Sequence, residues 1–260
     1  MGSLFKFINI MEINQAQSLK ENWVYGKQNS VKLSKKEIEL INSVLVGSLL
    51  GDGHLQFSPR ISFIDLSKLP RDGKTRFRFG QKIGQKAYVN FIYSMLKPLC
   101  ITTQKPHQDL NSFFHFYTNY FTELTVYHEI WYQYRFSENN LTEKSYVKCV
   151  PKQLEKILTD PLSLFLWYLD DGSLRTDCLA ARIATQCFSF SEHEFLQEVL
   201  KRNFQLETTI AKSGISKYGT IQRYSLGIPA KSFRKFLNLV QPFRASVPQM
   251  AYKFERPRND

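Results

Sequence analysis

The hydrophobic and polar positions of the chain predict a set of helices and strands that occurs twice. After residue 34 the apolar residues follow the spacing of an amphipathic helix, at Ile38, Ile41, Val44, Leu45 and Leu49. Ser34 and Glu37 form the pattern of a capping box at the start of this helix, and Gly51-Asp52-Gly53 predicts its end. A mostly apolar helix therefore opens the first set.

Strand and helix patterns continue from there to residue 132. We expect strands at Arg60–Asp65, Thr75–Gly80, Ile101–Lys105 and Phe113–Thr118, and helices at about Gln85–Leu99 and Phe121–Tyr132. In the second strand Arg76 and Arg78 alternate with two phenylalanines, which predicts a sheet with one basic face and one apolar face. Residues 1–33 have no sustained periodicity and are interpreted as an N-terminal extension.

The same order of elements returns after a hydrophilic connector at Ser137–Ser145. Asp160-Pro161 opens a helix, since proline is tolerated at the first helical position, and Asp170-Asp171-Gly172 ends it. The remaining expected elements are a strand near Arg182–Gln186, a helix from a capping box at Ser191–Glu194 to Phe204, strands near Glu207–Lys212 and Thr220–Leu226, and a helix near Lys231–Leu239. The pattern predicts an α+β protein of two duplicated αββαββα units, residues 34–145 and 146–260.

The composition favours a globular protein that binds a polyanion. The 260 residues are 43% hydrophobic and 22% charged, ordinary values for a chain with a buried core, which excludes disorder and fibrous repeats. The net charge of +12 is typical of a protein that binds nucleic acid or an anionic membrane surface. A membrane is disfavoured, because the longest apolar stretches, Ile41–Gly51 and Pro161–Leu169, are far shorter than the ~20 residues of a spanning helix.

Neither a leader peptide nor a cysteine framework is visible. Residues 1–20 lack the apolar region and cleavage site of a signal peptide and the Arg-rich pattern of a transit peptide. The cysteines are scattered without a C-x-x-C pair, which fits a reducing compartment and predicts neither a zinc site nor a disulfide framework. The many Phe, Tyr, Asn, Ile and Lys residues, which AT-rich codons encode, agree with an organellar gene of a mitochondrion or chloroplast.

Two mostly apolar helix ends, Leu45–Gly53 and Leu164–Gly172, finish on Asp-Gly. A carboxylate is unfavourable there because the C-terminal end of a helix carries negative partial charge. One such Asp-Gly is an ordinary turn dipeptide, but its recurrence in a duplicated unit favours a chemical role for Asp52 and Asp171. Two adjacent carboxylates need a cation, and their hard oxygen ligands favour Mg²⁺ or Ca²⁺.

These two nine-residue stretches resemble the paired signature of the LAGLIDADG homing endonucleases, of the single-chain type found in the yeast mitochondrial omega-intron endonuclease. Four runs of the second unit carry the same resemblance: Trp167–Gly172, Thr185–Phe190, Asn203–Leu206 and Pro248–Lys253. It covers about residues 35–255 and is stronger after residue 150. It implies a monomer whose antiparallel sheets form a DNA-binding saddle, with the signature helices at the interface, and which cuts both strands of a long asymmetric site, leaving 3′ overhangs, during intron homing.

The resemblance also implies roles for individual residues. Asp52 and Asp171 would bind a divalent metal together with the backbone carbonyls of Gly51 and Asp170. The metal would be Mg²⁺, with Mn²⁺ substituting and Ca²⁺ binding without supporting cleavage. Lys148 and Lys253 would stabilise the charged phosphorane, Gln81 and Gln186 would order water, and Lys82, Gln85 and Lys86 would contact phosphates.

Base-reading residues are expected on the basic face of the sheets. Arg76 and Arg78 fit a β-platform in a DNA major groove, where arginine reads guanine bidentately, and Gln222 and Arg223 are the weaker analogue in the second unit. A plain solvated sheet would show the same alternation. The histidines show no ligand spacing and are assigned no role, and Trp131 and Trp167 are expected in the core.

One departure from the signature and two alternative functions accompany this prediction. Gly47 and Gly51 leave one face of the first helix bare for close packing, but the second has Phe165 and Leu166 where small residues are usual. We therefore expect the helices to lie further apart or to pack asymmetrically, with unequal catalytic centres. The alternatives are an intron-encoded maturase that binds its intron RNA, alone or as a second activity, and a catalytically inactive DNA-binding regulator. The intact carboxylates favour the nuclease.

Overall fold

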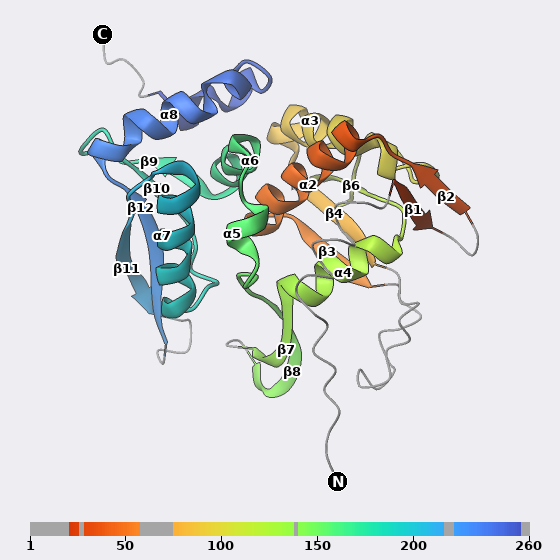
Figure 1. Cartoon of the computed structure of the whole chain (residues 1–260), viewed down its shortest axis with the longest axis horizontal. Helices are drawn as coiled ribbons and strands as arrows, with labels where there is room; N and C mark the ends of the chain where they lie inside the picture. Colours follow the sequence, from red (N-terminus) through yellow and green to blue (C-terminus); the bar gives the residue numbers. More distant parts are fainter. Residues whose placement is uncertain (1–20, 26–28, 58–74, 138–139, 216–220, 256–260) are drawn as a thin grey trace.

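The structure, a computed structural model, describes residues 21–25, 29–57, 75–137, 140–215 and 221–255. Two units of the order αββαββα lie on either side of a central helix pair (Figure 1). The first comprises α2 (Lys35–Leu50), β3 (His54–Phe57), β4 (Thr75–Lys82), α3 (Lys86–Leu96), β5 (His107–Gln108), β6 (Phe113–Tyr117) and α4 (Thr122–Trp131). The second comprises α6 (Pro161–Asp171), β9 (Gly172–Leu174), β10 (Ala181–Ile183), α7 (Phe190–Phe204), β11 (Thr209–Ile215), β12 (Gln222–Ile228) and α8 (Ala230–Arg244). The predicted fold class is confirmed.

Each unit forms a four-stranded antiparallel sheet with the same strand order, β3-β4-β6-β5 in the first and β9-β10-β12-β11 in the second. In β4 the side chains of Phe77 and Phe79 are fully buried, and the ring of Phe79 meets Tyr88 of α3. Arg76 and Arg78 lie on the opposite face and are half-buried. The predicted division into an apolar, helix-covered face and a basic, open face is therefore confirmed.

The helices α2 and α6 pack against each other at the centre of the molecule (Figure 1). A Cβ atom at Gly47 would lie 2.4 Å from the carbonyl oxygen of Ser163, so the two backbones are in direct contact. The small residue that faces Gly47 is Ser163, whose hydroxyl donates to the carbonyl of Ser43 at 2.8 Å. The helices thus lie close together and pack asymmetrically, and the alternative of a wider separation is wrong.

Two hairpins add to the repeated pattern. β1 (Asn22–Tyr25) and β2 (Asn29–Lys32) form one within the predicted extension, and the Trp23 ring packs edge-on against Phe121. β7 (Tyr132–Ser137) and β8 (Asn140–Lys148) form the other. It replaces the irregular connector predicted at Ser137–Ser145, because backbone pairing with the preceding strand gives this polar segment a partner that its own composition does not reveal.

Three smaller predictions differ from the structure or lie outside the residues that it describes. Residues 101–105 are not a strand, since the side-chain oxygen of Asn119 accepts the N–H groups of Ile101 and Thr102 that a sheet would use. The second capping box is Ser189–Glu192 instead of Ser191–Glu194. Because α7 begins at this position, His193 is buried, and its ring is hydrogen-bonded to the Ser189 carbonyl and the Thr185 hydroxyl. The strand predicted at Arg60–Asp65 lies outside the described residues.

Short helices complete the chain: η3 (Ile83–Gln85), η4 (Lys97–Leu99), α5 (Leu154–Ile157) and η5 (Pro248–Lys253). α8 extends past its predicted end and through Pro242. Trp131 and Trp167 are fully buried, as predicted. Over the described residues, no helix is both long and apolar enough to span a membrane.

His128 gives the folded protein a pH dependence that can be measured. Its ring is 3% exposed and stacks on Tyr132 with centroids 4.5 Å apart, and burial lowers its pKa to about 4. In the unfolded chain the imidazole takes up a proton near pH 6.5. The contribution of the neutral, buried ring to the free energy of unfolding is therefore complete above that pH. It falls by at most about 3 kcal/mol as the pH decreases towards 4. Urea unfolding at about pH 7.5 and about pH 4.5 should show a smaller loss in His128→Phe than in the wild type. Equal losses would contradict the assignment.

Candidate active site

The two signature acids lie at neighbouring helix ends. Asp52 follows α2, and Asp171 is the last residue of α6. Burial, together with the negative charge of Asp52, raises the pKa of Asp171 to about 7. The backbone N–H of Asp52 donates to Oδ2 of Asp170 at 3.1 Å, across the interface between the two units. The pair of acids that the sequence predicted is thus brought together at the end of the central interface.

Two lysines, both from residues 146–260, bind the backbone beside these acids. Lys148, at the end of β8, donates from Nζ to the carbonyl oxygens of Gly51 and Gly53, both at 2.8 Å. Lys253, in η5, donates to the carbonyl of Asp170 at 3.1 Å. Burial lowers the pKa of both ammonium groups, against the opposing effect of the surrounding aspartates. The two lysines occupy equivalent places, each on the carbonyl that precedes a signature aspartate.

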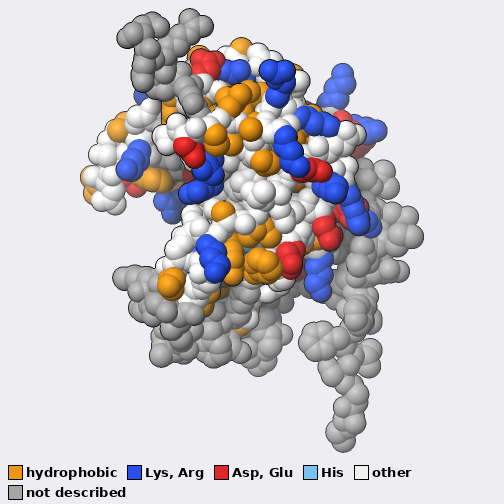
Figure 2. Space-filling model, turned by 90° about the vertical axis from the view of Figure 1, so that its left-hand side faces the viewer, with side chains coloured by type: hydrophobic (Ala, Val, Ile, Leu, Met, Phe, Trp, Pro, Cys, Tyr) orange, Lys and Arg blue, Asp and Glu red, His pale blue; other side chains and the backbone are white. Residues whose placement is uncertain are grey.

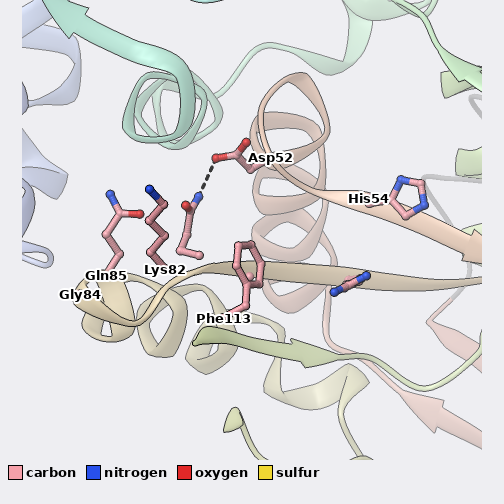
Figure 3. A pocket seen from close by; sticks show the side chains of 9 residues that line it. Asp52, His54, Lys82, Gly84, Gln85 and Phe113 are labelled. Carbon is pink, nitrogen blue, oxygen red and sulfur yellow. Dashed lines mark hydrogen bonds between the residues drawn. The ribbon is translucent and has the colours of Figure 1, made fainter. Parts of the chain in front are cut away.

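The two predicted glutamines differ. Gln81 donates from Nε2 to Oδ2 of Asp52 at 2.6 Å, the bond drawn as a dashed line in Figure 3. Gln186 instead donates to the hydroxyl of Ser213 in β11, at 2.9 Å. Only Gln81 is therefore hydrogen-bonded to a signature acid, and the surroundings of the two acids are unequal.

A cleft of about 790 Å³ opens on the exposed face of the first sheet. It is lined by Asp52, His54, Arg78, Gly80, Gln81, Lys82, Gly84, Gln85 and Phe113. Figure 3 shows Lys82 and Gln85 on the same side of the β4 ribbon as Asp52. The predicted phosphate-contacting residues Lys82 and Gln85 therefore share one cleft with the first acid, whereas Lys86 lies over the ring of Phe114, 5.3 Å from its centroid.

Arg76 is held by neighbours that the sequence did not single out. Its Nε and Nη2 both donate to Oε1 of Gln56, at 3.1 and 2.9 Å, and its guanidinium carbon lies 3.9 Å from the ring centroid of Tyr117. Arg78 lies next to it, 5.6 Å from the same centroid. A cation stacked on an aromatic ring and hydrogen-bonded on one edge keeps its other edge in a fixed direction.

In the second sheet the two predicted residues, Gln222 and Arg223, have different surroundings. Gln222 donates to the carbonyls of Gly214 and Arg223, within its own hairpin. Tyr224 contacts His193 on the helix-covered face, so the alternation of β12 places Arg223 on the open face. Arg182 is an exposed residue on this open face that sequence reasoning missed, although its position between buried Ala181 and Ile183 signals it.

The surface of the second unit is also rich in positive charge. Figure 2 shows Lys and Arg side chains distributed over this side of the molecule, with Asp and Glu side chains between them. Together with the net charge of +12, this distribution favours association with a polyanion over a wide area.

Residues 42–236 match the LAGLIDADG DNA endonuclease family. The chain belongs to this family. The resemblance noted from the two signature helices is thereby confirmed.

Two curated relatives and one solved structure illustrate the match. The chain is 30% identical to the DNA endonuclease I-ChuI of Chlamydomonas applanata, over 81% of this chain and 92% of the relative. It is 26% identical to the cytochrome b mRNA maturase bI2 of Saccharomyces cerevisiae, over 82% of this chain, but it spans only 47% of that maturase. The homing endonuclease I-WcaI bound to its DNA recognition sequence shares the fold, with a TM-score of 0.58, 22% identity, and coverage of 84% and 86% of the two chains.

The oxygen atoms around the LAGLIDADG signature aspartates suit a hard divalent cation. They are the carboxylates of Asp52 and Asp171 and the carbonyls of Gly51 and Asp170. Burial, and after it the negative charge of Asp52, raises the pKa of Asp171, and a cation would offset both effects. Within the described ranges, no three or more His, Cys, Asp and Glu side chains form a metal-binding group.

Proposed function

We propose that the protein is a homing endonuclease that hydrolyses both strands of a long asymmetric double-stranded DNA site, leaves 3′ overhangs and promotes intron homing. The observation that carries this proposal is the pairing of Asp52 and Asp171, each with a lysine beside its helix end. The protein would act as a monomer, since one chain supplies both acids: residues 34–145 contribute Asp52, and residues 146–260 contribute Asp171 and both lysines. Residues 1–33 would be an N-terminal extension.

The proposed metal is Mg²⁺, which would bind at two catalytic centres, one built on Asp52 and one on Asp171, with the carbonyls of Gly51 and Asp170 as further ligands. Mn²⁺ would substitute, and Ca²⁺ would bind without supporting cleavage. When bound, the metal would neutralise charge that develops on the phosphate. The ammonium groups of Lys148 and Lys253 add positive charge for the same phosphate oxygens. Gln81, whose amide donates to Asp52, retains its carbonyl oxygen as an acceptor that orients the attacking water.

DNA would lie along the open faces of the two sheets. Arg76 and Arg78 would reach base edges in the major groove, and the phosphate contacts would come from Lys82, Gln85 and Lys86. Gln222 and Arg223 would supply weaker contacts in the second unit. The net charge of +12 supports a binding constant that falls steeply as salt concentration rises.

The alternative, or additional, function is that of a maturase that binds its own intron RNA. The observation that favours it is the similarity to the cytochrome b mRNA maturase bI2. That similarity, with the abundance of residues that AT-rich codons encode, also supports a gene and a site of action in an organelle, a mitochondrion or chloroplast.

Cleavage selection tests the proposal. The purified protein and Mg²⁺ are incubated with a DNA pool that covers candidate insertion sites, alongside Asp52→Asn and Asp171→Asn. We expect a single staggered cut that is lost with EDTA and in the variants. If the folded protein cuts nothing and binds structured RNA equally well with both aspartates replaced, the nuclease proposal fails and the maturase replaces it.

Gln81→Ala should slow one strand selectively. Removing a hydrogen bond to a carboxylate costs about 1.5 kcal/mol, which corresponds to roughly a tenfold slower cut at the centre that depends on Asp52. Gln186→Ala is the matched comparison. Because its amide donates to Ser213 and not to Asp171, we expect it to lack the water-ordering role that the resemblance implied, and both its strand rates should stay within about twofold of the wild type. Strand-resolved cleavage of end-labelled DNA measures this, and equal effects of the two substitutions would refute the assigned asymmetry.

A further inference from the structure

A side chain from the second unit holds Asp52 in place. The backbone N–H of Asp52 donates to Oδ2 of Asp170 at 3.1 Å, and Oδ1 of Asp170 accepts a hydrogen bond from the Tyr88 hydroxyl at 2.7 Å. Tyr88 belongs to α3 of the first unit and is fully buried, while Asp170 belongs to α6 of the second. The Asp170 carboxyl group therefore joins two segments of the first unit across the interface.

Gly51 provides the space for this contact. A Cβ atom at position 51 would lie 2.5 Å from both Cβ and Oδ2 of Asp170, so a side chain there would displace the carboxyl group. The residue of the first signature that matches Asp170 is Gly51 itself, which has no side chain. The contact from Asp170 to the first unit thus has no equivalent in the opposite direction.

The backbone conformation also differs between the two acids. α2 ends at Leu50, and the N–H groups of Gly51 and Gly53 both donate to the Ser48 carbonyl, so Asp52 lies beyond the helix. In contrast, Asp171 is a residue of α6 and is held by that helix. Asp171 is therefore held by its own helix, whereas the segment around Asp52 is held by the turn at Ser48, by Lys148 on the flanking carbonyls and by Asp170, which binds the backbone N–H of Asp52 itself.

We propose that Asp170 and Tyr88 form a positioning pair that orients Asp52 and serves only the catalytic centre built on Asp52. This inference rests on the proposed nuclease function. Loss of the pair lets the segment after α2 shift, which slows the reaction at that centre, while Asp171 keeps its place. The measurable consequence is a change in the ratio of the two strand-cleavage rates at nearly unchanged DNA affinity.

Tyr88→Phe tests the pair, because it removes the hydroxyl and keeps the ring that packs edge-on against Phe79. Tyr127→Phe is the matched control, since it removes another buried hydroxyl, which donates to Asn42 well before Asp52 in α2. Single-turnover rates are measured for each strand, together with DNA affinity in Ca²⁺. We expect Tyr88→Phe and Asp170→Ala to change the strand ratio by about fivefold or more, slowing the strand that Gln81→Ala slows, and Tyr127→Phe to leave the ratio unchanged.

Hydrogen exchange of the Asp52 amide, followed by NMR in the metal-free protein, gives a second readout that does not need cleavage. Exchange should be faster in Tyr88→Phe and Asp170→Ala than in the wild type and Tyr127→Phe. An unchanged strand ratio, equal slowing of both strands, or unchanged exchange would overturn the positioning pair. A wild type that cuts no DNA would instead overturn the nuclease proposal, and the exchange measurement would still decide whether the pair holds Asp52.

Discussion

Asp171→Asn is expected to abolish cleavage of at least one DNA strand while leaving DNA affinity within a few-fold of the wild type. The substitution keeps the size of the side chain but removes the negative charge proposed to hold the metal beside Asp52. Removal of a single preorganised charge or donor at a reacting centre typically slows a reaction by roughly 10²–10³-fold. Single-turnover cleavage in Mg²⁺ and binding in Ca²⁺ measure the two effects separately.

The control for this substitution is Asp177→Asn. Asp177 is an exposed aspartate of the same unit that pairs with Arg175 at the surface, so its loss leaves the site unchanged. Exposed ion pairs contribute little to stability, and both strand rates should equal those of the wild type. Normal cutting by Asp171→Asn would disprove the role assigned to Asp171, and lost cutting by Asp177→Asn would show that the loss is not specific to the site.

The same Asp171→Asn substitution should stabilise the metal-free protein at alkaline pH. The folded-state pKa of about 7 lies above the ordinary value of 3.8, so the folded state binds the proton more tightly than the unfolded state. As the pH rises from about 4 to about 7, the free energy of unfolding of the wild type therefore decreases by roughly 2–4 kcal/mol. Urea unfolding in EDTA should show the variant to be the more stable protein above pH 7, and a less stable variant would contradict this sign.

The parts of the fold that sequence could predict are those in which the periodicity and the burial agree. The helix at Lys35–Leu50 has a capping box, a continuous apolar face and a glycine stop, and the strand at Thr75–Lys82 alternates strictly between Phe and Arg. The β7–β8 hairpin was missed because its strands pair through backbone groups, and the two segments that pair are both polar. The strand at residues 101–105 was wrong because Asn119 takes up the local N–H groups.

The candidate site also has residues that the sequence could predict and residues that it could not. Asp52 and Asp171 could be found because the same dipeptide recurs at the ends of two duplicated helices, and the lysines followed from the family resemblance. The support around them could not be found, since Tyr88 and Asp170 meet only after two units pack together. The asymmetry between Gln81 and Gln186 is likewise a result of tertiary packing, because similar sequence positions reach different partners.

Gly47→Ala should cause the largest loss of stability of any single added methyl group in the central interface. The new Cβ would lie 2.4 Å from the carbonyl oxygen and 2.8 Å from the Cα of Ser163, both backbone atoms that no rotamer change can move. The helices would have to separate, and overpacking of this kind costs about 3 kcal/mol or more, against less than about 1 kcal/mol gained from the helix propensity of alanine. Thermal and urea unfolding measure the net loss.

Gly84→Ala is the matched control, because a Cβ atom at Gly84 would meet nothing within 4 Å. Its stability should equal that of the wild type or exceed it slightly, since alanine restricts the unfolded chain. Separation of α2 and α6 would also move Asp52 away from Asp170 and Asp171, so Gly47→Ala should lose cleavage at temperatures where it is still folded. If Gly47→Ala is as stable as Gly84→Ala and as active as the wild type, the close contact with Ser163 does not determine the pairing of the two acids.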